Sequence, residues 1–331
     1  MDKIRYGIIG CGRFAEKTIV GAIRASSNSE LVAIQKRSRA AAEEKASELG
    51  VPFAFDSVEA LVSHSAVDAV FIVSANAAHH PETLLAAQAG KHVLVEKPMA
   101  MNAREGREMI NVCAAHRVKL MVGHMLRFSP LVNRMRDLIR GGELGKVVVA
   151  RAEFIYDARL SHRNWLFDRR IAGGGPIYDI GVHCLDTLRF VLDDEVSSVE
   201  SQLEPMPTDE TTESIAHLQL KFSRRTIASI LCSFVAPIRR TWIEIVGTDA
   251  LISASDFTVG ERETPLTVTR GWKDQPEDVR VEKFVVPNLY VEEVSHFSDC
   301  ILNNREPILS GLNGLQNQWV LDRAMSPGVA L

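Results

Sequence analysis

Short apolar runs alternate with segments of helical spacing over the first 123 residues. The apolar runs have the length of buried strands, and the segments between them repeat apolar positions every three or four residues. The expected strands are residues 4–9, 31–35, 68–74, 92–96 and 119–123, and the expected helices are residues 14–25, 40–49, 81–89 and 103–115. This alternation predicts βαβ units, and therefore a parallel sheet with right-handed crossovers.

The pattern changes after residue 123. Residues 196–286 are mostly strand-like and contain no clear helix, which favours an antiparallel sheet. Around them we expect one further strand, 147–155, and four helices, 131–140, 176–192, 290–302 and 312–325. We therefore predict two domains. Residues 1–123 form a doubly wound α/β domain, and residues 124–331 form an α+β domain on a large, mostly antiparallel open sheet.

Composition narrows the class of protein. The chain has 331 residues, of which 46% are hydrophobic and 24% charged, as in ordinary globular proteins that are large enough for two domains. The formal net charge of −4 gives no electrostatic reason to bind nucleic acid or an anionic membrane surface. Apolar runs stay shorter than a membrane span, and the start of the chain has no signal-peptide pattern.

The cysteines and histidines suggest neither a disulfide framework nor a metal site. The five cysteines are far apart, odd in number and never in a CxxC arrangement. This pattern fits reduced thiols in the cytoplasm. His79 and His80 have no third ligand at a suitable spacing, so we expect no metal.

A glycine fingerprint follows the first expected strand. Gly10 and Gly12 precede Arg13, Phe14 and Ala15, which gives G-x-G-x-x-A between a strand and a helix. The glycines permit a tight turn and the close approach of a pyrophosphate, whose charge then lies at a helix N-terminus. Within a βαβ unit this motif predicts a bound dinucleotide.

The end of the second strand indicates which dinucleotide is bound. Enzymes that use NAD usually carry an acidic residue there, which binds the ribose 2′-hydroxyl. This chain instead has Lys36, Arg37 and Ser38, which offer positive charge and a hydroxyl to a 2′-phosphate. A solvated basic loop is the other interpretation of these residues. We expect NADP(H) to be preferred, with NAD(H) possible.

Two further strands end in polar residues. Lys97, after Glu96 and before Pro98, emerges where ligands bind in parallel sheets. Pro98 restricts Lys97 to an extended conformation, and the bond between them can be cis or trans. The expected strand 68–74 ends at Ser74, and we expect this residue, Asn76 and His79 to contact the cofactor.

A glycine run, residues 173–175, leads into the expected helix at 176–192. Pro176 occupies a favoured first helical position. Asp179 and His183 are four residues apart, so both project from the same face. A carboxylate beside an imidazole can act as an acid/base pair near neutral pH. An ordinary buried polar pair is the alternative.

Together these motifs resemble the glucose-fructose oxidoreductase, inositol dehydrogenase and rhizopine-catabolism (Gfo/Idh/MocA) superfamily. The resemblance extends over essentially the whole chain. It implies an N-terminal Rossmann domain and a C-terminal domain whose sheet often makes oligomer contacts. Residues 187–194 also resemble 1,5-anhydrofructose reductases and related NADP sugar reductases.

The resemblance also implies roles for individual residues. Lys97 would bridge the cofactor and a substrate hydroxyl, His183 would exchange a proton with the reacting oxygen, and Asp179 would orient the substrate or His183. His124 stands where relatives often carry an aromatic residue, and it would face the substrate; a loop histidine with no role is the alternative. Arg127, Arg163 and Trp165 are further candidate substrate ligands, because arginine binds hydroxyls or anions and tryptophan can stack on a sugar ring.

These expectations favour an NADP(H)-dependent oxidoreductase acting on a sugar, cyclitol or sugar derivative, assembled as a dimer or tetramer through its C-terminal sheet. One alternative is a non-catalytic, nucleotide-sensing regulatory protein of the same fold, which would not need Lys97, Asp179 and His183 together. The other is an NAD-using, redox-neutral glycosidase. The lack of an acid after the second strand disfavours tightly bound NAD.

Overall fold

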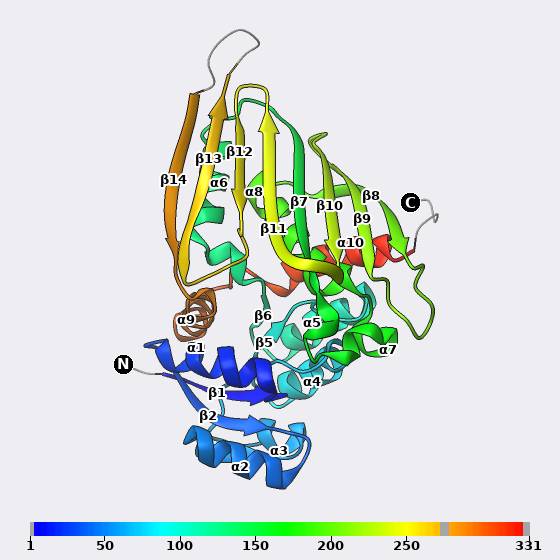
Figure 1. Ribbon diagram of the computed structural model, residues 1–331. Helices are drawn as coiled ribbons and strands as arrows, with labels where there is room; N and C mark the ends of the chain where they lie inside the picture. Colours follow the sequence, from blue (N-terminus) through cyan, green and yellow to red (C-terminus); the bar gives the residue numbers. More distant parts are fainter. Residues whose placement is uncertain (1–2, 272–277, 327–331) are drawn as a thin grey trace. The chain divides into compact units, whose positions relative to one another are not determined.

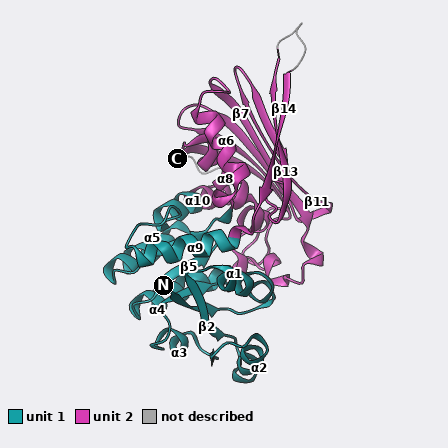
Figure 2. Ribbon diagram, turned by 90° about the vertical axis from the view of Figure 1, so that its left-hand side faces the viewer, with its two compact units in different colours: residues 1–125, 290–318 teal, residues 126–289, 319–331 magenta. Residues whose placement is uncertain are grey.

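The computed structural model describes residues 3–271 and 278–326. The chain divides into two compact units, coloured separately in Figure 2. Unit 1 comprises residues 1–125 and 290–318, and unit 2 comprises residues 126–289 and 319–331. Residues 272–277, within the segment predicted to be rich in strands, lie outside the described residues.

Unit 1 contains a six-stranded parallel sheet in the order β3-β2-β1-β4-β5-β6, of which Figure 1 labels β1, β2, β5 and β6. Its strands are β1 (Ile4–Ile9), β2 (Ser29–Gln35), β3 (Phe53–Phe55), β4 (Ala69–Ile72), β5 (His92–Glu96) and β6 (Leu120–Gly123). The strand order reverses between β1 and β4, the place at which doubly wound sheets bind ligands. The predicted Rossmann-type fold is confirmed, although the three residues of β3 were too short a run to be recognised.

The helices of unit 1 follow its strands. They are α1 (Val20–Ala25), α2 (Arg39–Leu49), α3 (Val58–Val62), α4 (Asn76–Gln88) and α5 (Ala103–Ala115). Helix α4 begins five residues earlier than predicted and keeps Pro81 in its interior. Its first residue, Asn76, therefore follows the carboxyl end of β4 after a short connection, residues 73–75.

Two late helices, α9 (Leu289–Leu302) and α10 (Gly311–Ala324), contribute to unit 1, whereas we expected all of residues 124–331 in the second domain. The Tyr6 hydroxyl on β1 lies 2.8 Å from Ser298 Oγ on α9, and Leu315 on α10 belongs to the same buried cluster as Val95 and Met109. The apolar spacing of these helices does not reveal which core they cover, so the sequence could not assign them.

Unit 2 contains an eight-stranded sheet in the order β14-β13-β12-β11-β7-β10-β9-β8. All its neighbouring strands are antiparallel except β10 and β7, which are parallel. This confirms the expected large, mostly antiparallel sheet. Its strands are β7 (Val147–Asp157), β8 (Val196–Glu204), β9 (Ile215–Phe222), β10 (Ile227–Ser233), β11 (Val235–Gly247), β12 (Leu251–Ser255), β13 (Arg262–Arg270) and β14 (Asp278–Val286).

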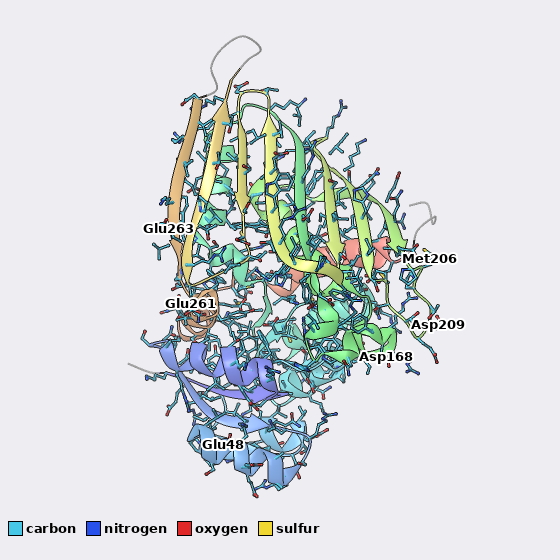
Figure 3. All side chains as sticks on the ribbon, in the orientation of Figure 1. Glu48, Asp168, Met206, Asp209, Glu261 and Glu263 are labelled. Carbon is cyan, nitrogen blue, oxygen red and sulfur yellow. The ribbon has the colours of Figure 1, made fainter. Side chains whose placement is uncertain are left out.

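Helices cover one face of this sheet. Helix α8 (Val182–Leu192) packs on β7, and α6 (Pro130–Arg140) packs on α8, β13 and β14. A short helix, α7 (Arg169–Ala172), precedes the glycine run, and Asp168, labelled in Figure 3, caps it by accepting the Arg170 N–H. Along β10 the buried side chains alternate with Ile227 and Leu231, which are exposed. Within the described residues, no helix is both long and apolar enough to cross a membrane.

Candidate active site

The turn after β1 has the geometry of a dinucleotide-binding loop. Gly10 has a φ of +77°, and a Cβ there would lie 2.8 Å from the Ser74 backbone, so only glycine fits. Gln35 holds the turn from β2, because its Oε1 accepts the Gly10 N–H (3.0 Å) and its carbonyl accepts the Cys11 N–H (2.9 Å). The turn leads into a π-helical turn, Ala15–Ile19.

Gly12, Arg13 and Phe14 are exposed on this turn. The Phe14 ring contacts Tyr290 edge-on, with centroids 5.7 Å apart. Exposed backbone at the start of a helix, next to an arginine, suits the charge of a pyrophosphate. The residues present therefore fit a nicotinamide dinucleotide.

The basic segment after β2 differs from our expectation at Lys36. Its ammonium forms an ion pair with Glu16 Oε1 (2.8 Å) and donates to the Cys11 carbonyl (2.9 Å). Burial alone would raise the pKa of Glu16, but its hydrogen bond from Lys36 and the nearby lysine charges outweigh burial and lower it. Arg37 and Ser38 are exposed, and the Ser38 hydroxyl caps α2 by accepting the Ala41 N–H.

His79 requires a correction, because its side chain is buried rather than directed at a cofactor. Its Nδ1 lies 2.8 Å from the Pro98 carbonyl and its Nε2 lies 3.2 Å from the Ser74 carbonyl. Burial lowers the pKa of His79 to about 4, so the ring is neutral at physiological pH and donates to one carbonyl at a time. His79 thus links the loop after β4 to the loop after β5.

Ser74 and Asn76 lie at the carboxyl end of β4, as expected. The Ser74 hydroxyl donates to Glu82 Oε2 at 2.5 Å. Burial raises the pKa of the Glu82 carboxyl to about 7, despite this hydrogen bond. An acid that titrates near neutral pH therefore lies next to the loop that touches Gly10.

Lys97 follows β5 directly and is partly exposed, and its bond to Pro98 is cis. Glu96, expected to bind the cofactor, is instead buried and accepts the Lys97 N–H at 3.2 Å. It also acts on a second acid, because burial and then the Glu96 charge raise the pKa of Glu293 on α9. Glu96 therefore shapes the lysine loop from inside the unit.

In unit 2, Asp179 lies in a π-helical turn, Ile177–Gly181, which continues into α8 with His183. The helix begins where expected, but its first turn is wider than an α-helical one, since the Val182 N–H bonds to the Ile177 carbonyl. Single π turns occur frequently at functional sites. Both Asp179 and His183 are buried.

A buried carboxylate, Glu213, holds the start of this helix. Its Oε1 accepts the N–H groups of Gly175 (2.9 Å) and Ile177 (3.2 Å), which satisfies donors that a helix start leaves open. Burial raises the pKa of Glu213. A Cβ at Gly175 would collide with the Glu213 carbonyl oxygen, so the glycine run is required by close approach as well as by turning.

Asp179 is the centre of a hydrogen-bonded cluster. Arg163 binds it with both terminal nitrogens, at 3.1 and 3.0 Å, and the Tyr156 hydroxyl donates to its Oδ2 at 2.8 Å. The Phe154 ring has its centroid 6.1 Å from that of Tyr156 and 6.3 Å from that of the His183 imidazole. Arg163 was expected near the substrate, and its side chain is 38% exposed.

Arg127 also requires a correction. Its guanidinium is buried in a two-pronged ion pair with Asp186 (2.9 and 2.7 Å) and lies over the Phe190 ring. This pair joins the start of unit 2 to α8, so we withdraw Arg127 as a substrate ligand. His124 is buried after β6, with Nε2 3.0 Å from Asn317 Nδ2, and Trp165 is half-buried in unit 2.

Reasoning from the sequence missed Tyr156 and Glu213. The expected strand 147–155 stopped one residue short of Tyr156, whereas β7 continues to Asp157. Glu213 lies in the segment 196–286 that we expected to be mostly strand-like, and its complete burial is what reveals its role. The available signals were a tyrosine near the end of a strand with an arginine shortly after it, and an acid shortly before a strand in which apolar residues alternate with polar ones.

Comparisons with known proteins agree with this geometry. Residues 4–124 match the oxidoreductase family with an NAD-binding Rossmann fold, and residues 132–253 match the GFO/IDH/MocA C-terminal domain. The chain belongs to the Gfo/Idh/MocA oxidoreductase family. Like other members, it is an enzyme of the dehydrogenase and reductase class.

Three Gfo/Idh/MocA relatives illustrate the similarity. A 1,5-anhydro-D-fructose reductase from Ensifer adhaerens is 32% identical over 314 residues, or 94% of this chain and 92% of the relative. A D-xylose 1-dehydrogenase [NADP(+)] from Haloarcula marismortui is 26% identical over 95% of this chain and 88% of its own. The crystal structure of an aldose-aldose oxidoreductase from Caulobacter crescentus matches with a TM-score of 0.86 and 27% identity, covering 98% and 97% of the two chains.

Proposed function

We propose that this protein is an NADP(H)-dependent oxidoreductase that transfers hydride between nicotinamide and a ring carbon of a sugar, cyclitol or sugar derivative. The observation that carries this proposal is the buried Asp179–His183 arrangement on a helix that begins with glycines, in a member of an oxidoreductase family. The relatives named for anhydrofructose and xylose support a sugar-like substrate.

The roles follow from the chemistry of a ketone reduction. Bound nicotinamide supplies the hydride. Negative charge then develops on the substrate oxygen, and a proton donor must neutralise it. His183 is the proposed donor, because imidazole exchanges protons near neutral pH. Lys97 is proposed to hold the same oxygen through a charge-assisted hydrogen bond.

The segment after β2 is the basis for the proposed preference for NADP(H). Arg37 and Ser38 are exposed beside the N-terminus of α2, whose dipole adds to their attraction for a 2′-phosphate. The relative from Haloarcula marismortui carries NADP(+) in its name. NAD(H) is the second candidate, since Lys36 is already paired with Glu16.

We further propose a cytoplasmic homo-oligomer, either a dimer or a tetramer, that assembles through the uncovered face of the unit 2 sheet. Ile227 and Leu231 on β10, Ile215 on β9 and Val281 on β14 are exposed apolar side chains of that sheet. Ile215, Ile227 and Leu231 lie on the paired strands β9 and β10, whereas Val281 lies on the opposite edge strand. Exposed apolar surface is typical of protein contacts. All five cysteines are buried free thiols, as suits a reducing compartment.

An absorbance screen at nicotinamide wavelengths tests the function. Purified protein is mixed with NADP(H) or NAD(H) and a panel of cyclitols, aldoses, ketoses, anhydro-sugars and nucleotide sugars. We expect turnover with at least one of these compounds, and faster turnover with NADP(H). Dinucleotide binding without turnover on any compound would instead favour the regulatory alternative.

A further inference from the structure

Tyr156, Arg163 and Asp179 form a closed triangle of hydrogen bonds in unit 2. Besides the three bonds that Asp179 accepts, Arg163 Nη2 donates to the Tyr156 hydroxyl oxygen at 2.7 Å. Each member therefore contacts the other two. The Asp179 carboxylate uses both oxygens in this triangle, so its position and orientation are fixed by two side chains from outside its own helix.

The charges within the triangle are balanced. Asp179 is buried, and the Arg163 guanidinium compensates its charge in a two-pronged geometry that arginine favours. Burial alone would lower the pKa of Arg163, but the charge of Asp179, the neighbouring Tyr156 and the hydrogen bonds to both together outweigh burial and raise it. Burial, followed by the Asp179 charge, raises the pKa of Tyr156, which therefore remains a hydrogen-bond donor.

The surrounding structure fixes both donors. The Tyr156 ring packs edge-on against Phe234 at 5.5 Å and lies 6.1 Å from Phe154. Arg163 follows His162, whose φ of +58° is unusual for a residue with a side chain. Conformations of this kind persist only where neighbouring contacts enforce them, and they concentrate at functional sites.

The loop that carries Arg163 is anchored on both sides. The Ala158 N–H donates to the Phe234 carbonyl at 2.9 Å, and the Thr212 hydroxyl donates to the Leu166 carbonyl at 3.0 Å. These bonds tie the loop to the connection between β10 and β11 before Arg163, and to the segment that precedes β9 after it. The guanidinium thus reaches Asp179 from a fixed support rather than from a free surface loop.

We propose that Tyr156 and Arg163 are positioning residues that hold Asp179 in the orientation needed for the reaction at His183. This inference rests on the proposed function and adds to it. A carboxylate with both oxygens bound by strong donors orients its surroundings and does not take up the reaction's proton. The proton transfer is left to His183, one helical turn further on.

Kinetics of matched variants test the proposal. Tyr156→Phe removes only the hydroxyl, Arg163→Gln removes the charge, and Arg163→Lys keeps the charge without the two-pronged geometry. We expect kcat/KM to fall by about tenfold to a hundredfold in Tyr156→Phe and Arg163→Gln, since small misplacements of reacting groups have effects of this size. Arg163→Lys should recover part of the loss, and NADPH affinity should stay unchanged in all three.

The control variant is Arg159→Gln. Arg159 makes a similar two-pronged pair with Asp157 (2.9 and 2.7 Å) in the same segment, but it is exposed. Its loss should leave kcat/KM within about twofold, because exposed pairs contribute little. Thermal unfolding of each variant identifies any that fail to fold. Tyr156→Phe, the mildest change, remains usable if Arg163→Gln does not fold.

A double-mutant cycle separates positioning from general damage. In an Asp179→Asn background, Tyr156→Phe should lower kcat/KM by less than about twofold, because the group through which it acts is already altered. A full additional loss in that background would overturn the proposal, as would near-normal kcat/KM in both Tyr156→Phe and Arg163→Gln. Failure of the wild-type protein to turn over any sugar would instead refute the proposed function, and the inference with it.

Discussion

The Lys36 ammonium and the Glu16 carboxylate form an ion pair 2.8 Å long next to the dinucleotide turn. Lys45 lies 3.4 Å from the other oxygen of Glu16, so one acid faces two lysines. Lys36 therefore offers less uncompensated charge to a 2′-phosphate than its place in the sequence suggests. We therefore expect Glu16 to affect the preference between NADP(H) and NAD(H).

We expect NADPH to bind more tightly than NADH, with a preference that falls as salt rises, because exposed charges are screened. Lys36→Asp should erase or reverse the preference, since an acid repels a 2′-phosphate and accepts from a 2′-hydroxyl. Glu16→Gln should increase the preference for NADPH over NADH by about twofold to fivefold, because Lys36 then loses the carboxylate that compensates its charge. Fluorescence titration with both dinucleotides measures these affinities, and Lys17→Asp, an exposed site on the same turn, is the charge-matched control. Equal affinity of the unmodified protein for NADH and NADPH would contradict the expectation.

The sequence predicted those features that depend on local spacing. The glycine fingerprint, the strand ending at Glu96 and the helix carrying Asp179 and His183 each need only a few adjacent residues. Hydrophobic period and glycine position are local properties, so these elements were placed correctly to within a few residues.

Features that depend on distant partners were not predictable in this way. Glu213 bonds to Gly175, 38 positions away, and Arg127 bonds to Asp186, 59 positions away. In each pair, the sequence around one residue does not indicate its partner. For the same reason the sequence suggested that Arg127 and His79 contact ligands. In the structure both side chains are buried and form hydrogen bonds within the protein. A charged or polar residue near a motif shows its role only when its partner is known.

The raised pKa of Glu82 predicts a pH-dependent stability. The folded protein holds this proton up to about pH 7, whereas an unfolded glutamate loses it near its ordinary pKa of 4.5. The folded state thus binds more protons between these values, and the free energy of unfolding falls as pH rises through that window. The loss is at most about 3 kcal/mol and is complete above pH 7.

Glu82→Gln should remove this dependence. We expect the melting temperature of the variant to rise relative to the unmodified protein between pH 5 and pH 8, and the difference to level off above about pH 7. Calorimetry across this range measures it, with Glu59→Gln as a control on the neighbouring helix α3. A constant difference at all pH values would show that Glu82 ionises normally in the folded protein.

The close approach of Gly175 to Glu213 predicts that small changes there destabilise unit 2. Gly175→Ala must push the Glu213 carbonyl away and should cost about 1–3 kcal/mol. Glu213→Ala should cost a similar amount, because two helix N–H groups lose their acceptor. Gly21→Ala, where a Cβ meets nothing within 4 Å, should be neutral or slightly stabilising. Chemical denaturation compares the three, and equal effects at Gly175 and Gly21 would argue against the close contact.

The exposed apolar side chains of β10 predict the site of self-association. Light scattering at micromolar concentration should give a dimer or tetramer. Leu231→Glu should shift it toward the monomer, because a charge cannot be buried in such a contact without a partner. Met206→Glu is the control: Met206 is 57% exposed on the loop after β8, where Figure 3 labels it, and not on the sheet face. A monomeric unmodified protein would remove the proposed interface.

The catalytic roles proposed for Lys97 and His183 predict a loss of turnover when either residue is replaced. General acid–base help is typically worth about 10²–10⁴ in rate, so His183→Asn should lower kcat by about that factor while NADPH affinity persists. Lys97→Met should also lower kcat, and it should weaken NADPH binding as well if the lysine bridges cofactor and substrate.

The comparison is made at saturating NADPH with the best sugar from the screen, after thermal unfolding has shown that each variant folds. His217→Asn and Lys221→Met, two changes on β9, should leave kcat near normal. Near-normal turnover in either Lys97→Met or His183→Asn would exclude that residue from the mechanism. Near-normal turnover in both variants would place the reaction elsewhere in the protein.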